Sequence, residues 1–224
     1  FIRETFRNCS DLVVRRVILQ GGTEMLIAFL DGMVVAKALD DNLLNPLIYE
    51  QLPPDAQQIG ELIRKRAVAI TTLKSIGTFG EVVEGILSAS AILLVGGMAE
   101  GLLADVKGFQ TRSVEEPMTE AAVRGPRDGF TESLRTNTTL LRRRIRSSRL
   151  KFEPVTVGEL TRTDCLIAYI EGLAPDSLIT EVRNRLSRIK VDSILESQYI
   201  EELIEDNPYS PFPQIQDTER PDIV

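Results

Sequence analysis

Arginine is concentrated in one part of this 224-residue chain. Residues 124–149 contain eight arginines, no lysine and two acidic residues, although the net charge of the whole chain is −7. The guanidinium group is planar and always charged, and it can bind a carboxylate or a phosphate through two hydrogen bonds at once. This segment is therefore the part of the sequence whose residue types best fit the binding of an anionic group.

Two groups of arginines within the segment are candidates for contacts with a partner protein or with anionic lipid headgroups. They are Arg124 and Arg127, in a turn-forming sequence, and Arg142, Arg143 and Arg144, at the end of a helix expected over residues 130–146. A structural role is the alternative for both groups. The first could pair with nearby acids, and the second could stabilise the negative C-terminal end of the helix dipole. We interpret the five arginines as an interaction surface rather than a source of stability, since exposed ion pairs contribute only about 0–1 kcal/mol each.

The same segment contains candidate hinge residues. Pro117, Gly125 and Pro126 lie in the stretch before the arginine-rich helix. Proline and glycine impose unusual backbone requirements and mark turns or linkers. They predict a connection between two lobes that fold separately and change their mutual angle.

Composition argues against catalysis, and we expect no enzyme activity, no cofactor and no metal. The chain has no histidine, which is the commonest general base and metal ligand, and its two cysteines, Cys9 and Cys165, follow no ligand spacing. No strand–loop–helix sequence of the phosphate-binding type occurs. The acidic composition, with a pI near 4.9, and the scarcity of aromatic residues argue against nucleic-acid binding.

No segment is long enough to span a bilayer. The longest uncharged run covers residues 85–99, and it is interrupted by Gly96 and Gly97, whereas a spanning helix needs about 20 mostly apolar residues. The chain begins at Phe1 and stops at Val224 in mid-pattern, so we expect it to be part of a longer protein.

The sequence contains an internal repeat. Residues 23–33 match residues 163–173 at a constant offset of 140, with five of the eleven pairs identical. Each copy holds a short apolar run typical of a strand buried on both faces, preceded by another strand candidate and followed by a helix. The repeat predicts two related α/β lobes.

The expected fold class is α/β, with two related lobes of mixed sheets and flanking helices joined by a linker. Helices are expected over residues 34–52, 56–66, 80–90, 130–146, 176–189 and 195–204, and further strands over residues 12–19, 69–75, 91–95, 101–107 and 150–157. The predicted domains are residues 1–112, residues 113–206 including the linker, and a proline-rich strap over residues 207–224 that leads to a membrane region outside this chain.

Several motifs resemble the A subunit of the GerA family of spore germinant receptors. They are residues 123–130 (Val-Arg-Gly-Pro-Arg-Asp-Gly-Phe), 142–145 (Arg-Arg-Arg-Ile), 164–172, 194–200, 207–213 and 218–222. The resemblance implies a soluble N-terminal region followed by membrane spans. It also implies a complex with B and C subunits in the spore inner membrane, with this domain on the cytoplasmic side, facing the spore core.

Two functions remain open at this point. The first is receptor assembly and the coupling of a nutrient signal to ion release during germination, through contacts with the B and C subunits, other A subunits and anionic lipids. The second is a sensing module that binds a small-molecule germinant in a cleft between the lobes, as substrate-binding proteins do. The sequence names no polar cluster that would identify such a ligand.

Overall fold

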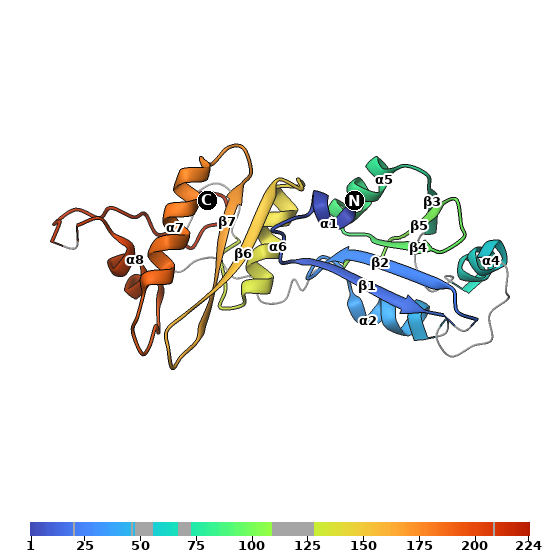
Figure 1. Ribbon diagram of the computed structural model, residues 1–224, viewed down its shortest axis with the longest axis horizontal. Coiled ribbons are helices and arrows are strands. Elements are labelled where there is room, and N and C mark those ends of the chain that lie inside the picture. The colour runs from blue at the N-terminus through green and yellow to red at the C-terminus, as the bar shows by residue number, and fades with distance from the viewer. Residues whose placement is uncertain (20, 46, 48–55, 67–72, 109–127, 208) are drawn as a thin grey trace. The chain divides into compact units, whose positions relative to one another are not determined.

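The computed structural model describes residues 1–19, 21–45, 47, 56–66, 73–108, 128–207 and 209–224. It has the expected α/β class, with strands paired into sheets and helices beside them (Figure 1). Every pair of described strands is antiparallel. The described chain divides into two compact units, of which unit 1 comprises residues 1–7, 11–108 and 141–148, and unit 2 comprises residues 8–10, 128–140 and 149–224.

Unit 1 is built on a five-stranded sheet with the order β1-β2-β4-β5-β3. The strands are β1 (Leu12–Ile18), β2 (Glu24–Leu30), β3 (Leu73–Ile76), β4 (Ala91–Val95) and β5 (Gly101–Ala104). β2 and β4 occupy the interior of the sheet and consist of nearly continuous apolar residues, as strands covered on both faces do. The register pairs Leu12 with Leu30 and Met25 with Val95. Side chains alternate between two faces of the sheet, and each face has its own packing partners.

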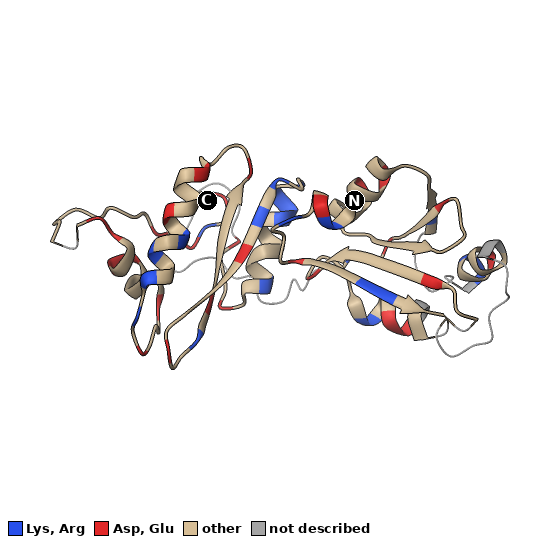
Figure 2. Cartoon of the chain, viewed as in Figure 1, with Lys and Arg blue, Asp and Glu red and all other residues tan. Residues whose placement is uncertain are grey.

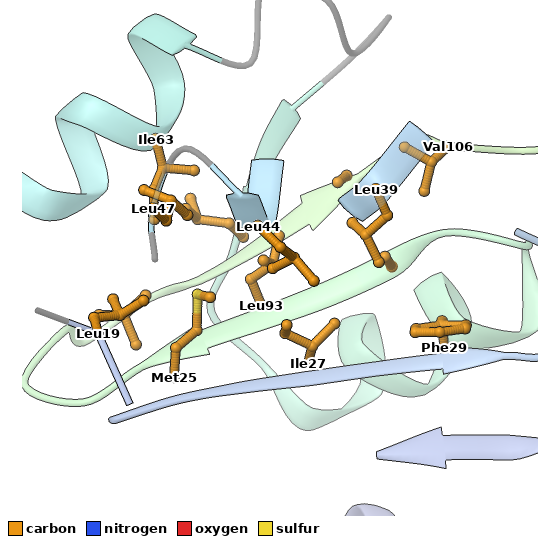
Figure 3. Packing of buried hydrophobic residues seen from close by; sticks show 14 of the residues in the cluster. Leu19, Met25, Ile27, Phe29, Leu39, Leu44, Leu47, Ile63, Leu93 and Val106 are labelled. Atoms are coloured by element: carbon orange, nitrogen blue, oxygen red, sulfur yellow. The ribbon is translucent and has the colours of Figure 1, made fainter. Parts of the chain in front are cut away.

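One face of this sheet carries the main hydrophobic core. Met25, Ile27 and Phe29 of β2 lie on this face beside Leu93 of β4 (Figure 3). The helical segments α2 (Ala36–Leu39), η1 (Asp40–Leu44) and α4 (Ala56–Arg66) cover it, and they supply the buried residues Leu39, Leu44, Ile59 and Ile63. α4 has the bounds predicted from sequence. In the described part of the helix expected over residues 34–52, α2 passes directly into the π-helical turn η1.

The opposite face is covered by α5 (Phe79–Leu87), and α1 (Ile2–Thr5) also belongs to this unit. α5 packs so closely that a Cβ on Gly85 would lie 2.8 Å from Ile92 and 2.7 Å from Leu103. The helix begins with a capping box in which Thr78 and Glu81 bind each other's backbone N–H groups. The Glu81 carboxylate accepts hydrogen bonds from the backbone N–H groups of Gly77 and Thr78, and these bonds lower the pKa of Glu81.

Unit 2 contains the hairpin of β6 (Leu150–Val157) and β7 (Thr163–Ile170), followed by α7 (Asp176–Arg188) and α8 (Ser197–Ile204). Its register pairs Leu150 with Ile170 and Val157 with Thr163. β6 is extended on its other side by residues 8–10, because Phe152 exchanges backbone hydrogen bonds with Asn8 and Ser10. Residues 8–10 therefore belong to unit 2, although the chain on either side of them belongs to unit 1.

The two copies of the internal repeat form the same kind of hairpin. Both are antiparallel, and with the offset of 140 their registers differ by two residues, which preserves the face of each side chain. Their environments differ. β2 is largely buried and has β4 as a second neighbour, whereas β7 is half-exposed and pairs only with β6 among the described strands. The prediction that both apolar runs are buried on both faces is therefore wrong for β7.

The chain after α8 contains turns and bends, with no helix or strand in residues 209–224. It is nonetheless attached to unit 2, since the N–H of Phe130 donates to the carbonyl of Glu219 at 2.7 Å, and Pro221 is buried. The predicted domain boundary between residues 112 and 113 lies outside the described residues. The membrane connection of the strap stays a prediction.

A polar cluster around Glu153 joins the parts of unit 2. The Glu153 carboxylate accepts two hydrogen bonds from Arg183 of α7, both at 2.7 Å, one from Asn8 at 2.9 Å, and one from the hydroxyl of Tyr169. The hydrogen bonds from Arg183 are the main cause of a lowered pKa for Glu153, and burial opposes them. Burial and the same carboxylate raise the pKa of Tyr169.

We expect Glu153→Gln to lower the free energy of unfolding by about 1 kcal/mol at neutral pH, because the charge-assisted bonds from Arg183 weaken. The folded-state pKa of Glu153 lies below its ordinary value of 4.5. The contribution is therefore present above that value and disappears as the pH falls through the folded pKa. Urea unfolding of both proteins between pH 7 and pH 3 should show their difference shrinking below about pH 4.5. Glu159→Gln, which changes an exposed carboxylate of the same unit, is the control, and a pH-independent difference for Glu153→Gln would contradict the prediction.

Candidate functional site

The described part of the arginine-rich segment, residues 128–149, contains α6 (Leu134–Arg144) and the turn that follows it. The helix begins after Ser133, whose hydroxyl accepts a weak hydrogen bond from the N–H of Thr136 at 3.4 Å. Its last turn carries Arg142, Arg143 and Arg144, so three cations lie at the negative end of the helix dipole (Figure 2). The helix is shorter than the predicted range of 130–146. The division between the two units falls inside it, after residue 140.

Arg142 has a different environment from the exposed surface expected from sequence. Its side chain is 1% exposed, and its guanidinium binds the carboxylate of Asp11 through two hydrogen bonds of 2.7 and 3.0 Å. A third bond of 2.8 Å goes to the carbonyl of Ser147. The side chain of Asp11 is 4% exposed. Arg142 therefore fixes the end of α6 to the start of β1 within unit 1, and we exclude it from the candidate surface.

Arg143 and Arg144 are more accessible. Arg143 is exposed and Arg144 is half-buried, and both take part in interactions within the molecule. Because Arg142 is anchored beside them, the backbone that carries these two arginines is held in a defined position. They remain the described part of the candidate interaction surface.

The other predicted site residues lie outside the described residues. These are the arginines Arg124 and Arg127 and the hinge candidates Pro117, Gly125 and Pro126. Their roles stay predictions, as does the ligand cleft expected between the two lobes.

The described residues offer no site for a metal, since no group of three His, Cys, Asp or Glu side chains among them could hold an ion. Cys9 is buried and Cys165 is half-buried, and both are free thiols. Burial, together with the neighbouring Asp164 carboxylate, raises the pKa of Cys165, which disfavours the reactive thiolate. In the part of the chain that the structure describes, no helix has the length and apolar character needed to cross a membrane.

Sequence reasoning missed the role of Asp11. This residue lies 131 positions from Arg142 and follows a short loop before β1, where an isolated acid is usually exposed. The one signal in the sequence is that Asp11 directly precedes the apolar and β-branched residues of β1, so that its side chain starts close to the core. No rule of spacing selects Arg142 among the neighbouring arginines as its partner.

We expect Arg142→Gln to lower the free energy of unfolding by about 3–5 kcal/mol, because it leaves the Asp11 carboxylate buried without its charge partner. Arg143→Gln, the matched control in the next position, should change it by about 0–1 kcal/mol because that side chain is exposed. Urea unfolding of the two variants measures both values.

The double variant Asp11→Asn with Arg142→Gln tests the pairing itself. It should lose less stability than the sum of the two single variants, because neither leaves a buried charge once both are changed. Additive losses, or an Arg142→Gln protein as stable as Arg143→Gln, would contradict the assignment.

Comparison with known proteins places these features in a family. The chain matches the family described as Bacillus/Clostridium GerA spore germination protein over residues 1–224. It is 41% identical over 219 residues to the uncharacterized membrane protein YfkQ of Bacillus subtilis, which covers 96% of this chain and 42% of that protein. It is 33% identical over 217 residues to spore germination protein KA of the same organism, covering 96% of this chain and 40% of that protein. The chain thus spans less than half the length of these relatives.

A solved structure has the same fold. It is the crystal structure of the N-terminal domain of the A subunit of the Bacillus megaterium spore germinant receptor GerK3, with a TM-score of 0.71 and 31% sequence identity. The alignment covers 99% of this chain and 82% of that one. The family match over all 224 residues and the similarity in fold point to the same family as the motifs in the sequence. The chain belongs to the GerA family of spore germination proteins, and its 224 residues correspond to the N-terminal domain of an A subunit.

Proposed function

We propose that this domain takes part in receptor assembly and signal coupling in a germinant receptor, and that it has no catalytic role. The observation that supports this is the anchored basic end of α6, where buried Arg142 holds the backbone next to exposed Arg143 and half-buried Arg144. A rigid backbone reduces the conformational entropy lost when such side chains bind a partner. Guanidinium groups in this position suit carboxylates of a neighbouring subunit or phosphates of anionic lipids.

The partners we propose follow from membership in the family. They are the B and C subunits of the same receptor and other A subunits, with anionic lipid headgroups as a further contact. The full-length protein would lie in the spore inner membrane, with this domain on the cytoplasmic side, facing the spore core. Germinant binding elsewhere in the receptor would then change the contacts of this domain, and the change would reach the membrane part that controls ion release.

Arg124 and Arg127 are included in the proposed surface on sequence grounds alone. Pro117, Gly125 and Pro126 are proposed as hinge residues on the same grounds. In this proposal the hinge lets the two units adjust to one another when a partner binds.

We expect the double variant Arg143→Gln with Arg144→Gln in the full-length protein to slow germinant-triggered ion release from spores, because contacts with a neighbouring subunit or lipid are lost. The isolated domain should keep its melting temperature within a few degrees, since the expected stability change is about 0–1 kcal/mol per exposed charge. Ion release from spores and thermal unfolding of the domain are the two measurements.

Arg188→Gln is the charge-matched control, since this arginine is exposed on α7 in unit 2. It should leave ion release unchanged. The proposal fails if the double variant releases ions as fast as the control. It also fails if spores of the double variant germinate at the normal rate and immunoblots show normal levels of all three subunits.

A further inference from the structure

Unit 1 contains a cavity of about 520 Å³ on the sheet face opposite the main core. Its floor includes Val14 of β1, Leu26 of β2 and Leu94 of β4, and its walls include residues of α1 and the start of α5. This volume is within the range of small-molecule sites, which are usually concave and mostly apolar with a few polar groups.

The apolar floor of the cavity is accessible because α5 does not cover the whole sheet face. Val14, Leu26 and Leu94 are half-buried, whereas Ile92, which lies under α5 beside Gly85, is fully buried. Gly101 also lines the cavity, and a Cβ there would lie 2.6 Å from Leu94 and 3.1 Å from Ile76. The missing side chain lets Leu94 and Ile76 approach each other and form a smooth apolar floor.

Two arginines, Arg3 of α1 and Arg16 of β1, line this cavity, and no acidic residue does. No ion pair with a described residue is found for either of them. The neighbouring Arg15, in contrast, forms an ion pair. It lies on the other face of the sheet, 3.6 Å from the carboxylate of Asp40 and 5.9 Å from the centre of the Phe29 ring.

The start of α5 does not supply a competing site for an anion. A carboxylate already lies there, because that of Glu81 is 2.9 Å from the backbone nitrogens of Gly77 and Thr78, and the N–H of Glu81 donates to the Thr78 hydroxyl at 3.3 Å. Glu81 itself does not line the cavity. The charged side chains in the cavity lining are the two guanidinium groups of Arg3 and Arg16.

We infer that this cavity binds a small molecule with one carboxylate and an apolar body. The carboxylate would be bound by Arg3 and Arg16, each of which can donate two parallel hydrogen bonds, and the apolar body would cover Val14, Leu26 and Leu94. The site lies entirely within unit 1, so it does not depend on how the two units move and is independent of the proposed role of α6.

The experiment uses the 224-residue chain and three probes, octanoate, 1-octanol and acetate, with binding followed by titration in methyl NMR spectra. Octanoate has both features of the inferred ligand, octanol lacks the charge and acetate lacks the apolar body. Octanoate should shift the methyl signals of Val14, Leu26 and Leu94 and bind at least about tenfold more tightly than either other probe. Equal binding of octanoate and octanol would overturn the inference, because the arginines would then contribute nothing.

Four variants locate the site. Arg3→Gln and Arg16→Gln should each weaken octanoate binding about tenfold. Arg15→Gln, on the opposite face of the same strand, should leave it unchanged. Ala99→Phe, at an exposed position in the cavity lining, should weaken binding by filling the cavity without changing any charge. Circular dichroism confirms that each variant is folded.

A membrane contact is the main competing explanation for the two exposed arginines. Vesicles of dioleoylphosphatidylglycerol provide that test. If they bind the chain through Arg3 and Arg16 while octanoate does not shift the three methyl signals, the inference is wrong and the cavity belongs to a lipid-binding surface. If octanoate binds and Arg3→Gln and Arg16→Gln have no effect, the site is elsewhere and the inference is also wrong.

Discussion

The buried ion pair between Asp11 and Arg142 holds together two segments that are far apart in the sequence, the start of β1 and the end of α6. Replacing such a pair by apolar residues is often neutral, but breaking it leaves a charge without a partner in a medium that cannot solvate it. The pair therefore favours the one arrangement in which the end of α6 lies at the start of β1. The backbone of Asp11 is itself held in the hairpin of β1 and β2, because its carbonyl accepts a 2.7 Å hydrogen bond from the N–H of Asp31. As a result residues 141–148 belong to unit 1, although the chain on either side of them belongs to unit 2.

Much of the fold could be predicted from sequence, because apolar periodicity controls it. The bounds of α4, β4 and β6 agree with the predicted ranges, and the strand pair in each copy of the repeat forms an antiparallel hairpin. The failures have physical causes. β7 has nearly the same apolar sequence as β2, yet it lies in a two-stranded sheet with no neighbour on one side among the described strands, so its side chains are only half-buried. Burial depends on what covers a strand, and the strand's own sequence does not contain that information.

The candidate site was harder to predict than the fold. Arg142, Arg143 and Arg144 are identical in type and adjacent, and a helix turns by about 100° per residue, so each side chain points in a different direction. Only the tertiary structure shows that Arg142 faces the Asp11 carboxylate and that Arg143 faces solvent. The cavity beside Arg3 and Arg16 was missed for the same reason. Its lining comes from five strands and two helices, and neither arginine lies in a recognisable motif.

The arginines of this molecule have different roles, and the role of each depends on how deeply the arginine and its acidic partner are buried. Where both partners are buried, as in the Asp11–Arg142 pair, the guanidinium specifies the fold and is not accessible to a ligand. Where the carboxylate is mostly buried and the arginine is half-exposed, as in the Glu153–Arg183 pair, it joins a helix to a hairpin and remains partly hydrated. Where an arginine lines an apolar cavity without an acid, as Arg3 and Arg16 do, its hydrogen-bonding capacity is available to a ligand. The inferred ligand site rests on this feature, since the cavity lining contains two guanidinium groups and no carboxylate.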